Sequence, residues 1–205
     1  MCVIITSPDR AHRPTLEQLT LCEATNSHGS GLAWLSGKHA QYEKGLSVRE
    51  IHDFLRRLNG PAIVHFRIAS VGGVNPDLCH PFPVTHRAPL RASGIARAVL
   101  FHNGTWSDHR LAADRFGISF PRREPVSDTR IAAAVIARFG FDWLHRAGAD
   151  RANRWALLDA RGIHRLGHWT KLRGCHFSNT YWRPPSQSEF GYGGDWWKFN
   201  DEEEA

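Results

Sequence analysis

The sequence predicts a layered α+β fold with one main domain. Short runs of β-branched residues and amphipathic stretches follow each other in clusters, without the strict strand–helix–strand order of a parallel α/β protein. A chain of 205 residues with 41% hydrophobic and 22% charged residues can bury a substantial core. The composition changes after Tyr181, so we expect a globular domain over residues 1–182 and an aromatic, acidic tail over residues 183–205.

The predicted strands are runs of apolar and β-branched residues bounded by turn residues. In one of them, Val64 and Phe66 share one face, whereas His65 and Arg67 share the other. The predicted strands are residues 2–6, 32–35, 62–70 and 98–102, followed by a β-hairpin of residues 155–158 and 163–166.

Capping residues mark the expected helix starts. Thr15 with Gln18, and Ser47 with Glu50, have the spacing of a capping box. A short helix is expected from Ser107 to about Phe116. Ser127 or Asp128 is expected to cap a longer helix, whose apolar stripe contains Ile131, Val135, Ile136 and Phe139.

The charge distribution argues against a specific nucleic-acid partner. The net charge is +6, but the basic residues are scattered singly or in pairs and form no basic run. No stretch has the form of a signal peptide or a membrane span. Four cysteines in a chain of this length do not make a disulfide scaffold. We therefore expect a cytoplasmic protein with no membrane contact.

Cys2 directly follows Met1, and this position has a chemical consequence. Cysteine is small enough for removal of Met1 to be expected, which would place a thiol and a free α-amine on one residue. Their reference pKa values are about 8.5 and about 8, so the amine can act as a general base near neutral pH. On its own, the residue could equally be a small buried hydrophobic side chain.

Four further segments lie behind Cys2 and carry a family resemblance. They are residues 65–72 (HFRIASVG) with Asn75 and Cys79-His80-Pro81-Phe82, residues 101–104 (FHNG), residues 126–129 (VSDT), and the loop of residues 26–34 (NSHGSGLAW). From Cys2 to about Ile136, the chain resembles the class II glutamine amidotransferases, which are N-terminal-nucleophile hydrolases. The resemblance implies a four-layer αββα sandwich and no cofactor.

The resemblance implies a catalytic role for three residues. Cys2 would attack the side-chain amide of glutamine, form a glutamyl thioester and release ammonia. The side-chain amide of Asn103 and the backbone N–H of Gly104 would stabilise the oxyanion. Asn-Gly taken alone would be read as a hairpin turn.

The resemblance also implies how the zwitterionic end of glutamine is bound. Arg67 would bind the α-carboxylate, Ser70 would add a hydrogen bond to it, and Asp128 would bind the α-ammonium. Without the family context, Arg67 could form a surface salt bridge and Asp128 could be a helix cap. His80 is expected to order its loop and not to transfer protons.

Several alternatives remain open on the sequence. The loop of residues 26–31 lacks the Arg-Gly-x-Asp form of members fused to a synthase, so a separate ammonia-accepting synthetase or ligase subunit is an expected partner. Another γ-glutamyl amide could replace glutamine, and a catalytically retired interaction module is the rival from a different class. The pairs Cys79-His80 and Cys175-His176 lack the spacing of zinc sites, and no G-x-S-x-G nucleophile motif is present, so no metal is expected.

Overall fold

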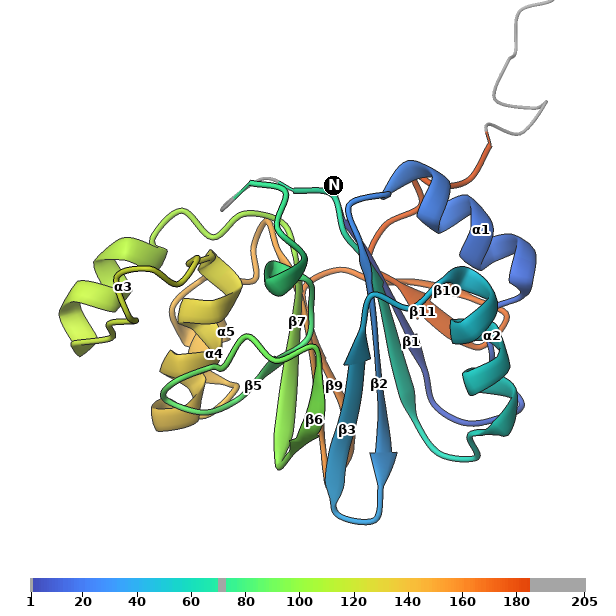
Figure 1. The fold of residues 1–205 in the computed structure, drawn as a ribbon, viewed down its shortest axis with the longest axis horizontal. Helices are drawn as coiled ribbons and strands as arrows, with labels where there is room; N and C mark the ends of the chain where they lie inside the picture. The colour runs from blue at the N-terminus through green and yellow to red at the C-terminus, as the bar shows by residue number, and fades with distance from the viewer. Residues whose placement is uncertain (1, 70–72, 185–205) are drawn as a thin grey trace, which may run out of the picture.

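The computed structural model describes residues 2–69 and 73–184, which form two packed sheets covered by helices on both outer sides (Figure 1). The elements are β1 (Val3–Ser7), α1 (Leu16–Thr25), β2 (Ser30–Ser36), β3 (His39–Lys44), α2 (Val48–Arg57), β4 (Ala62–Phe66), the 3₁₀ helix η1 (Pro76–Leu78), β5 (Phe82–Pro83), β6 (Ser93–Ala96), β7 (Ala98–Asn103), α3 (His109–Phe116), α4 (Asp128–Phe139), α5 (Trp143–Arg146), β8 (Arg154–Asp159), β9 (Gly162–Leu166), β10 (Thr170–Leu172) and β11 (Cys175–Phe177).

Both sheets are antiparallel. In the described residues, the first sheet has the strand order β10-β11-β1-β4-β2-β3-β6 and the second has the order β5-β7-β8-β9. Strands β1 and β4 are neighbours at the centre of the first sheet, and β7 and β8 are central in the second. The functional residues predicted at the ends of β1, β4 and β7 are therefore carried by well-supported strands.

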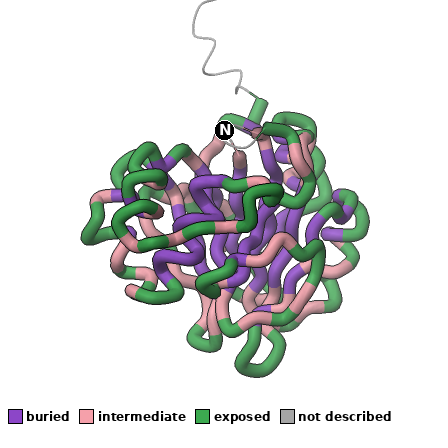
Figure 2. Tube along the Cα trace, turned by 60° about the vertical axis from the view of Figure 1, so that its left-hand side comes forward, coloured by how far each residue is buried: buried purple, intermediate pink, exposed green. Residues whose placement is uncertain are grey.

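Successive side chains of each strand point to opposite faces of its sheet, so the buried apolar residues form three clusters. One cluster lies between the two sheets, and the other two lie between a sheet and its helices, which gives four layers. Val3 and Val64 face α1 and α2 on the outer side of the first sheet. Ile4 of β1 and Phe101 of β7 meet in the cluster between the sheets. Leu100 points the other way and packs under α3, α4 and α5. Figure 2 shows that the buried residues fill the interior of this arrangement. The predicted αββα sandwich is confirmed.

The helix starts follow the predicted caps, with one exception at α3. The capping boxes Thr15–Gln18 and Ser47–Glu50 are both formed. At α4 the cap is Ser127, whose hydroxyl accepts a hydrogen bond from Arg130 N, so Asp128 is the first helical residue and not the cap. Helix α3 begins at His109, two residues after the predicted cap Ser107.

The strand predictions hold for most elements, although several bounds differ. The strand predicted over residues 62–70 ends at Phe66, because residue 67 bonds instead to the loop before β2. Strand β2 is longer than expected, and β1 begins at Val3, directly after Cys2. The β8–β9 hairpin is present as predicted. In the described part of the chain, no helix is both long and apolar enough to cross a bilayer.

Candidate active site

The pairing of β1 with β4 places Cys2 next to the residues that follow β4. Val3 pairs with Phe66, so the residue before β1 and the residues after β4 lie at the same edge. Cys2 Sγ lies 3.2 Å from the carbonyl oxygen of Ile68, to which it donates, and it accepts a hydrogen bond from Ile68 N at 3.3 Å. The sulfur is thus held against the backbone at the end of β4.

Burial determines the protonation of the Cys2 thiol. Removal from water raises the pKa of Cys2 above its ordinary value, and the hydrogen bond from Ile68 N lowers it only in part. A thiol with a raised pKa is mostly protonated at neutral pH. Attack by Cys2 therefore requires a base that takes the proton, and a free α-amine on the same residue would lie within reach.

Arg67 is buried with one guanidinium nitrogen unused. The residue is only 4% exposed, and its Nη2 donates to Gly73 O at 2.7 Å. Its Nη1 is buried and has no hydrogen-bond partner among the described residues. The backbone N–H of Arg67 donates to Gly29 O at 2.7 Å, which fixes the backbone from which the side chain extends. A buried guanidinium with a free donor can bind a carboxylate.

Asn103 is the last residue of strand β7 and Gly104 follows it, and the two do not form a hairpin turn. The chain continues from Gly104 towards α3, and β7 pairs with β5 and β8, neither of which is joined to it by a turn at Gly104. Asn103 is 2% exposed, its Nδ2 donates to Ser178 Oγ at 2.8 Å, and its Oδ1 has no partner among the described residues. The hairpin interpretation of Asn-Gly is therefore wrong.

Gly104 needs to be glycine for two reasons. Its φ is +137°, which side chains of L-residues rarely adopt. A Cβ at this position would also overlap Asn153 Oδ1.

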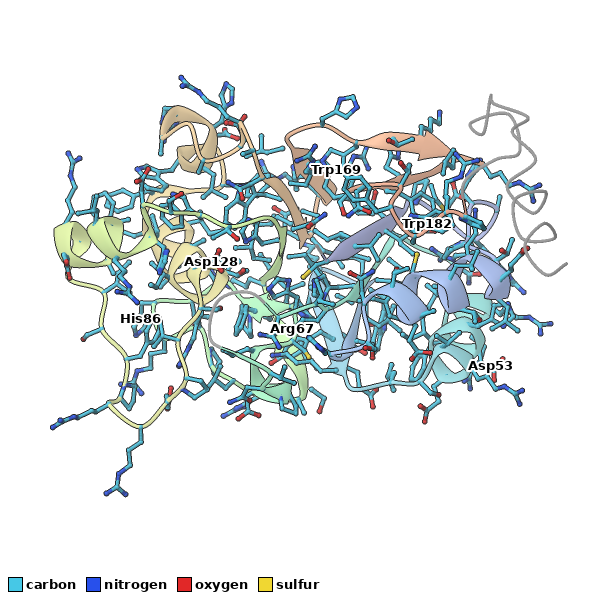
Figure 3. All side chains as sticks on the ribbon, turned by 90° about the horizontal axis from the view of Figure 1, so that it is seen from above. Asp53, Arg67, His86, Asp128, Trp169 and Trp182 are labelled. Atoms are coloured by element: carbon cyan, nitrogen blue, oxygen red, sulfur yellow. The ribbon has the colours of Figure 1, made fainter. Side chains whose placement is uncertain are left out.

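Asp128 lies at the first turn of α4 and is held by two backbone donors. Oδ2 accepts from Trp106 N at 2.9 Å, and Oδ1 accepts from Thr129 N at 2.8 Å. Each carboxylate oxygen can accept further hydrogen bonds, so the group remains able to bind an ammonium. Figure 3 shows Arg67 and Asp128 towards the middle of the molecule, whereas His86 and Asp53 lie nearer its ends.

His102 and Asn153 form a support behind Gly104 that the sequence analysis did not identify. Asn153 Nδ2 donates to Ala149 O at 2.8 Å, which leaves Asn153 Oδ1 to accept from His102 Nε2 at 2.9 Å. His102 Nδ1 lies 3.1 Å from Thr129 Oγ1. Burial lowers the pKa of His102, so the ring is neutral and carries its proton on Nε2. A histidine in the apolar run AVLFH was the only available signal in the sequence.

Residues after β11 also hold the site. Asn179 Nδ2 donates to the backbone carbonyl of Cys2 at 2.7 Å. Ser178 N donates to Ile4 O at 2.9 Å, and its hydroxyl accepts from Ile4 N at 2.8 Å. Cys2 is thus fixed from both sides, by the segment after β4 and by the segment after β11.

A small pocket brings most of the predicted residues together. Its cavity volume is about 20 Å³, and it is lined by Cys2, Arg67, Ile68, Leu78, His80, His102, Gly104, Ser127, Asp128 and Thr129. The Cys2 thiol therefore shares one pocket with a guanidinium, a carboxylate and the peptide of Gly104. Asn103 precedes Gly104 but does not line the pocket. Ser70 lies outside the described residues.

The two Cys-His pairs lie in ordinary structural surroundings. Cys79 Sγ lies 3.7 Å from His28 O, and Cys175 Sγ lies 3.4 Å from His12 O. Burial raises the pKa of both thiols, to about 11 for Cys175. Within residues 2–69 and 73–184, no group of three or more His, Cys, Asp or Glu side chains gathers as a metal site.

His65 makes folding sensitive to acid. It is fully buried beside the ring of His80, and neither of its ring nitrogens has a partner among the described residues. Burial, with further contributions from Arg67, His102 and Lys44, lowers the pKa of His65 from 6.5 to about 3. Below pH 6.5 the unfolded chain takes up a proton that the folded chain does not, so stability is lost as the pH falls towards 3.

We expect His65→Leu to reduce the acid sensitivity of the free energy of unfolding. Between pH 6.5 and pH 5, His65 should lower the free energy of unfolding of the original protein by about 2 kcal/mol. The His65→Leu variant should not show this part of the decrease. Urea unfolding at the two pH values measures the difference. His168→Gln, which replaces an exposed histidine, is the matched control and should leave the pH dependence unchanged. An equal loss in His65→Leu and the original protein would contradict this assignment.

Comparison with known proteins identifies the fold. No family model and no curated protein matches the sequence. Among solved structures, glutamine phosphoribosylpyrophosphate amidotransferase from B. subtilis, complexed with ADP and GMP, matches with a TM-score of 0.54 and 18% identity, over 86% of this chain and 41% of that one. A structure described as the allosteric regulatory enzyme of purine biosynthesis matches with a TM-score of 0.53 and 17% identity, over the same shares of the two chains.

The described chain thus corresponds to less than half of these larger proteins. At such low identity the likeness concerns the fold alone. The resemblance noted in the sequence is confirmed at the level of the fold: this chain shares its αββα fold with the glutamine phosphoribosylpyrophosphate amidotransferase to which it is similar.

Proposed function

We propose that this chain is an N-terminal cysteine amidohydrolase that releases ammonia from the side-chain amide of glutamine. The observation that carries the proposal is the pocket shared by Cys2, Arg67, Gly104 and Asp128. A guanidinium with a free Nη1 suits the α-carboxylate of an amino acid, and a carboxylate suits its α-ammonium. With these two groups bound, the side-chain amide of the glutamine would lie at the Cys2 thiol.

The reaction begins with a proton transfer. Once Met1 is removed, the α-amine of Cys2 accepts the thiol proton as Sγ attacks the amide carbon. The carbonyl oxygen of the amide becomes an oxyanion, which the N–H of Gly104 and the amide of Asn103 stabilise. The protonated amine then returns the proton to the leaving nitrogen, and ammonia departs from a glutamyl thioester.

Hydrolysis completes the cycle. Water attacks the thioester carbon with the α-amine again acting as base, a second oxyanion forms in the same place, and glutamate leaves with regeneration of the thiol. These steps use only groups of the chain and water. Both halves require the α-amine, so a chain that retains Met1 would bind glutamine without hydrolysing it.

We also propose that ammonia passes to a separate enzyme that activates an acceptor. The similar solved protein is named an amidotransferase, which supports transfer of the amide nitrogen as the purpose of such a site. A partner that docks near the pocket should raise glutaminase turnover when its own substrates are present. Full activity without any co-purifying partner would count against this part of the proposal.

The intact mass of the purified protein, before and after incubation with 6-diazo-5-oxo-L-norleucine, tests the main proposal. This compound is a glutamine-shaped electrophile, so we expect loss of Met1 and a single adduct on Cys2. Ammonia release from glutamine should stop in proportion to the labelled fraction. A processed chain that neither labels nor releases ammonia would overturn the glutamine proposal, and release from another γ-glutamyl amide would redirect it to that substrate.

A further inference from the structure

The side-chain amide of Asn103 faces Ser178 with its nitrogen. Asn103 Nδ2 donates to Ser178 Oγ at 2.8 Å, while the buried Asn103 Oδ1 is unpartnered within the described chain. A buried carbonyl oxygen without a hydrogen bond is costly, and such groups are rare in folded proteins. In the proposed function the amide of Asn103 donates to an oxyanion, but in this orientation its donor is engaged with Ser178 and only an acceptor is free.

The Ser178 hydroxyl is used only as an acceptor in this arrangement. It accepts from Ile4 N at 2.8 Å as well as from Asn103 Nδ2, which occupies both of its lone pairs. Its own proton then has no role in these contacts. The oxygen cannot move away, because Ser178 N also donates to Ile4 O at 2.9 Å and Ser178 is only 2% exposed.

A half-turn of the amide about its terminal torsion resolves both problems. The turn exchanges Oδ1 and Nδ2 of Asn103 and needs no other heavy atom to move. Ser178 O–H then donates to Oδ1, and the hydroxyl keeps its hydrogen bond from Ile4 N. Nδ2 takes the position that is now unpartnered and becomes a free donor.

We propose that Ser178 is a positioning residue that holds the Asn103 amide with its nitrogen available to the oxyanion. The inference rests on the proposed function, in which Asn103 is an oxyanion donor. The developing oxyanion favours the orientation with Nδ2 free, and the Ser178 hydroxyl stabilises that orientation by donating to Oδ1. The neighbouring Asn179 holds the Cys2 carbonyl at 2.7 Å, so one short segment aligns both the nucleophile and the oxyanion donor.

The kinetics of Ser178→Ala distinguish positioning from general support. We expect kcat for glutamine hydrolysis to fall about 100-fold, the loss typical of one missing oxyanion donor. KM and the affinity for the product glutamate should stay within about twofold, because neither depends on the oxyanion. Ser178→Cys, which keeps the size of the side chain but has a weak donor, should lose activity in the same direction and guards against a folding defect in the alanine variant.

A double-mutant cycle with Asn103→Ala provides the decisive comparison. If Ser178 acts through Asn103, Ser178→Ala will cause no further loss of kcat in the Asn103→Ala background. A full additional loss in that background, or an unchanged kcat in the single Ser178 variant, would overturn the inference. An original protein that neither hydrolyses glutamine nor labels at Cys2 would overturn the proposed function, and the inference with it.

Discussion

Cys2→Ala will fold like the original protein and release almost no ammonia from glutamine. Loss of a covalent nucleophile typically lowers kcat by ~10⁴-fold or more. The structural cost is small, because the half-buried Cys2 Sγ contributes hydrogen bonds only to the backbone of Ile68. Alanine is also small, so Met1 removal and the free α-amine are retained, and the variant isolates the thiol. Ammonia release and the melting temperature measure the two effects.

Cys22→Ala is the matched control for this experiment. Cys22 is fully buried in the cluster under α1, and burial raises the pKa of its thiol far above the ordinary value, so it is chemically inert. We expect this variant to lose some stability and to keep its kcat and its labelling at Cys2. Equal turnover by Cys2→Ala and the original protein would exclude the thioester mechanism.

Gly104→Ala will lose at least about 100-fold in kcat and will also be less stable. The added Cβ would overlap Asn153 Oδ1, which cannot retreat because His102 Nε2 and Ala149 O hold the two ends of that amide. The peptide of Gly104 must then shift, and its N–H leaves the position that suits the oxyanion. The unfavourable φ adds about 1–3 kcal/mol of strain. Kinetics and thermal unfolding of the same sample separate the two losses.

Gly162→Ala separates backbone strain from the loss of the oxyanion donor. Gly162 begins β9, also has a positive φ of +110°, and has open space where its Cβ would lie. This variant should lose stability by a similar strain but keep its kcat. If both alanine variants kept full activity, the N–H of Gly104 would have no role in catalysis.

The local features of the fold were predictable from the sequence. The capping boxes at Thr15 and Ser47 act over three residues, so sequence alone identifies them. The sequence analysis did not predict β3, because its inward positions are Ala40, Tyr42 and Lys44. A strand with a buried lysine lacks the apolar alternation by which strands are recognised. This segment forms a strand because it pairs with β2 on one side and β6 on the other.

The sequence named residues that the fold brings together, but not their support. Arg67, Gly104 and Asp128 line one pocket with Cys2, and their catalytic and binding roles stay a prediction. The contacts from Asn153 and Ser178 reach Gly104 and Asn103 across more than 40 positions of sequence, and a single sequence does not encode such distances in its local pattern. The same limit explains why the orientation of the Asn103 amide could not be foreseen.

The division of the pocket between the two sheets has a consequence for refolding. Cys2 and Arg67 belong to the edge formed by β1 and β4, whereas Gly104 follows β7 and Asp128 begins α4 on the far side of the second sheet. Neither half contains a complete set of catalytic groups. Turnover therefore reports whether the two sheets have docked correctly, and during refolding it should return only after secondary structure has formed in each half.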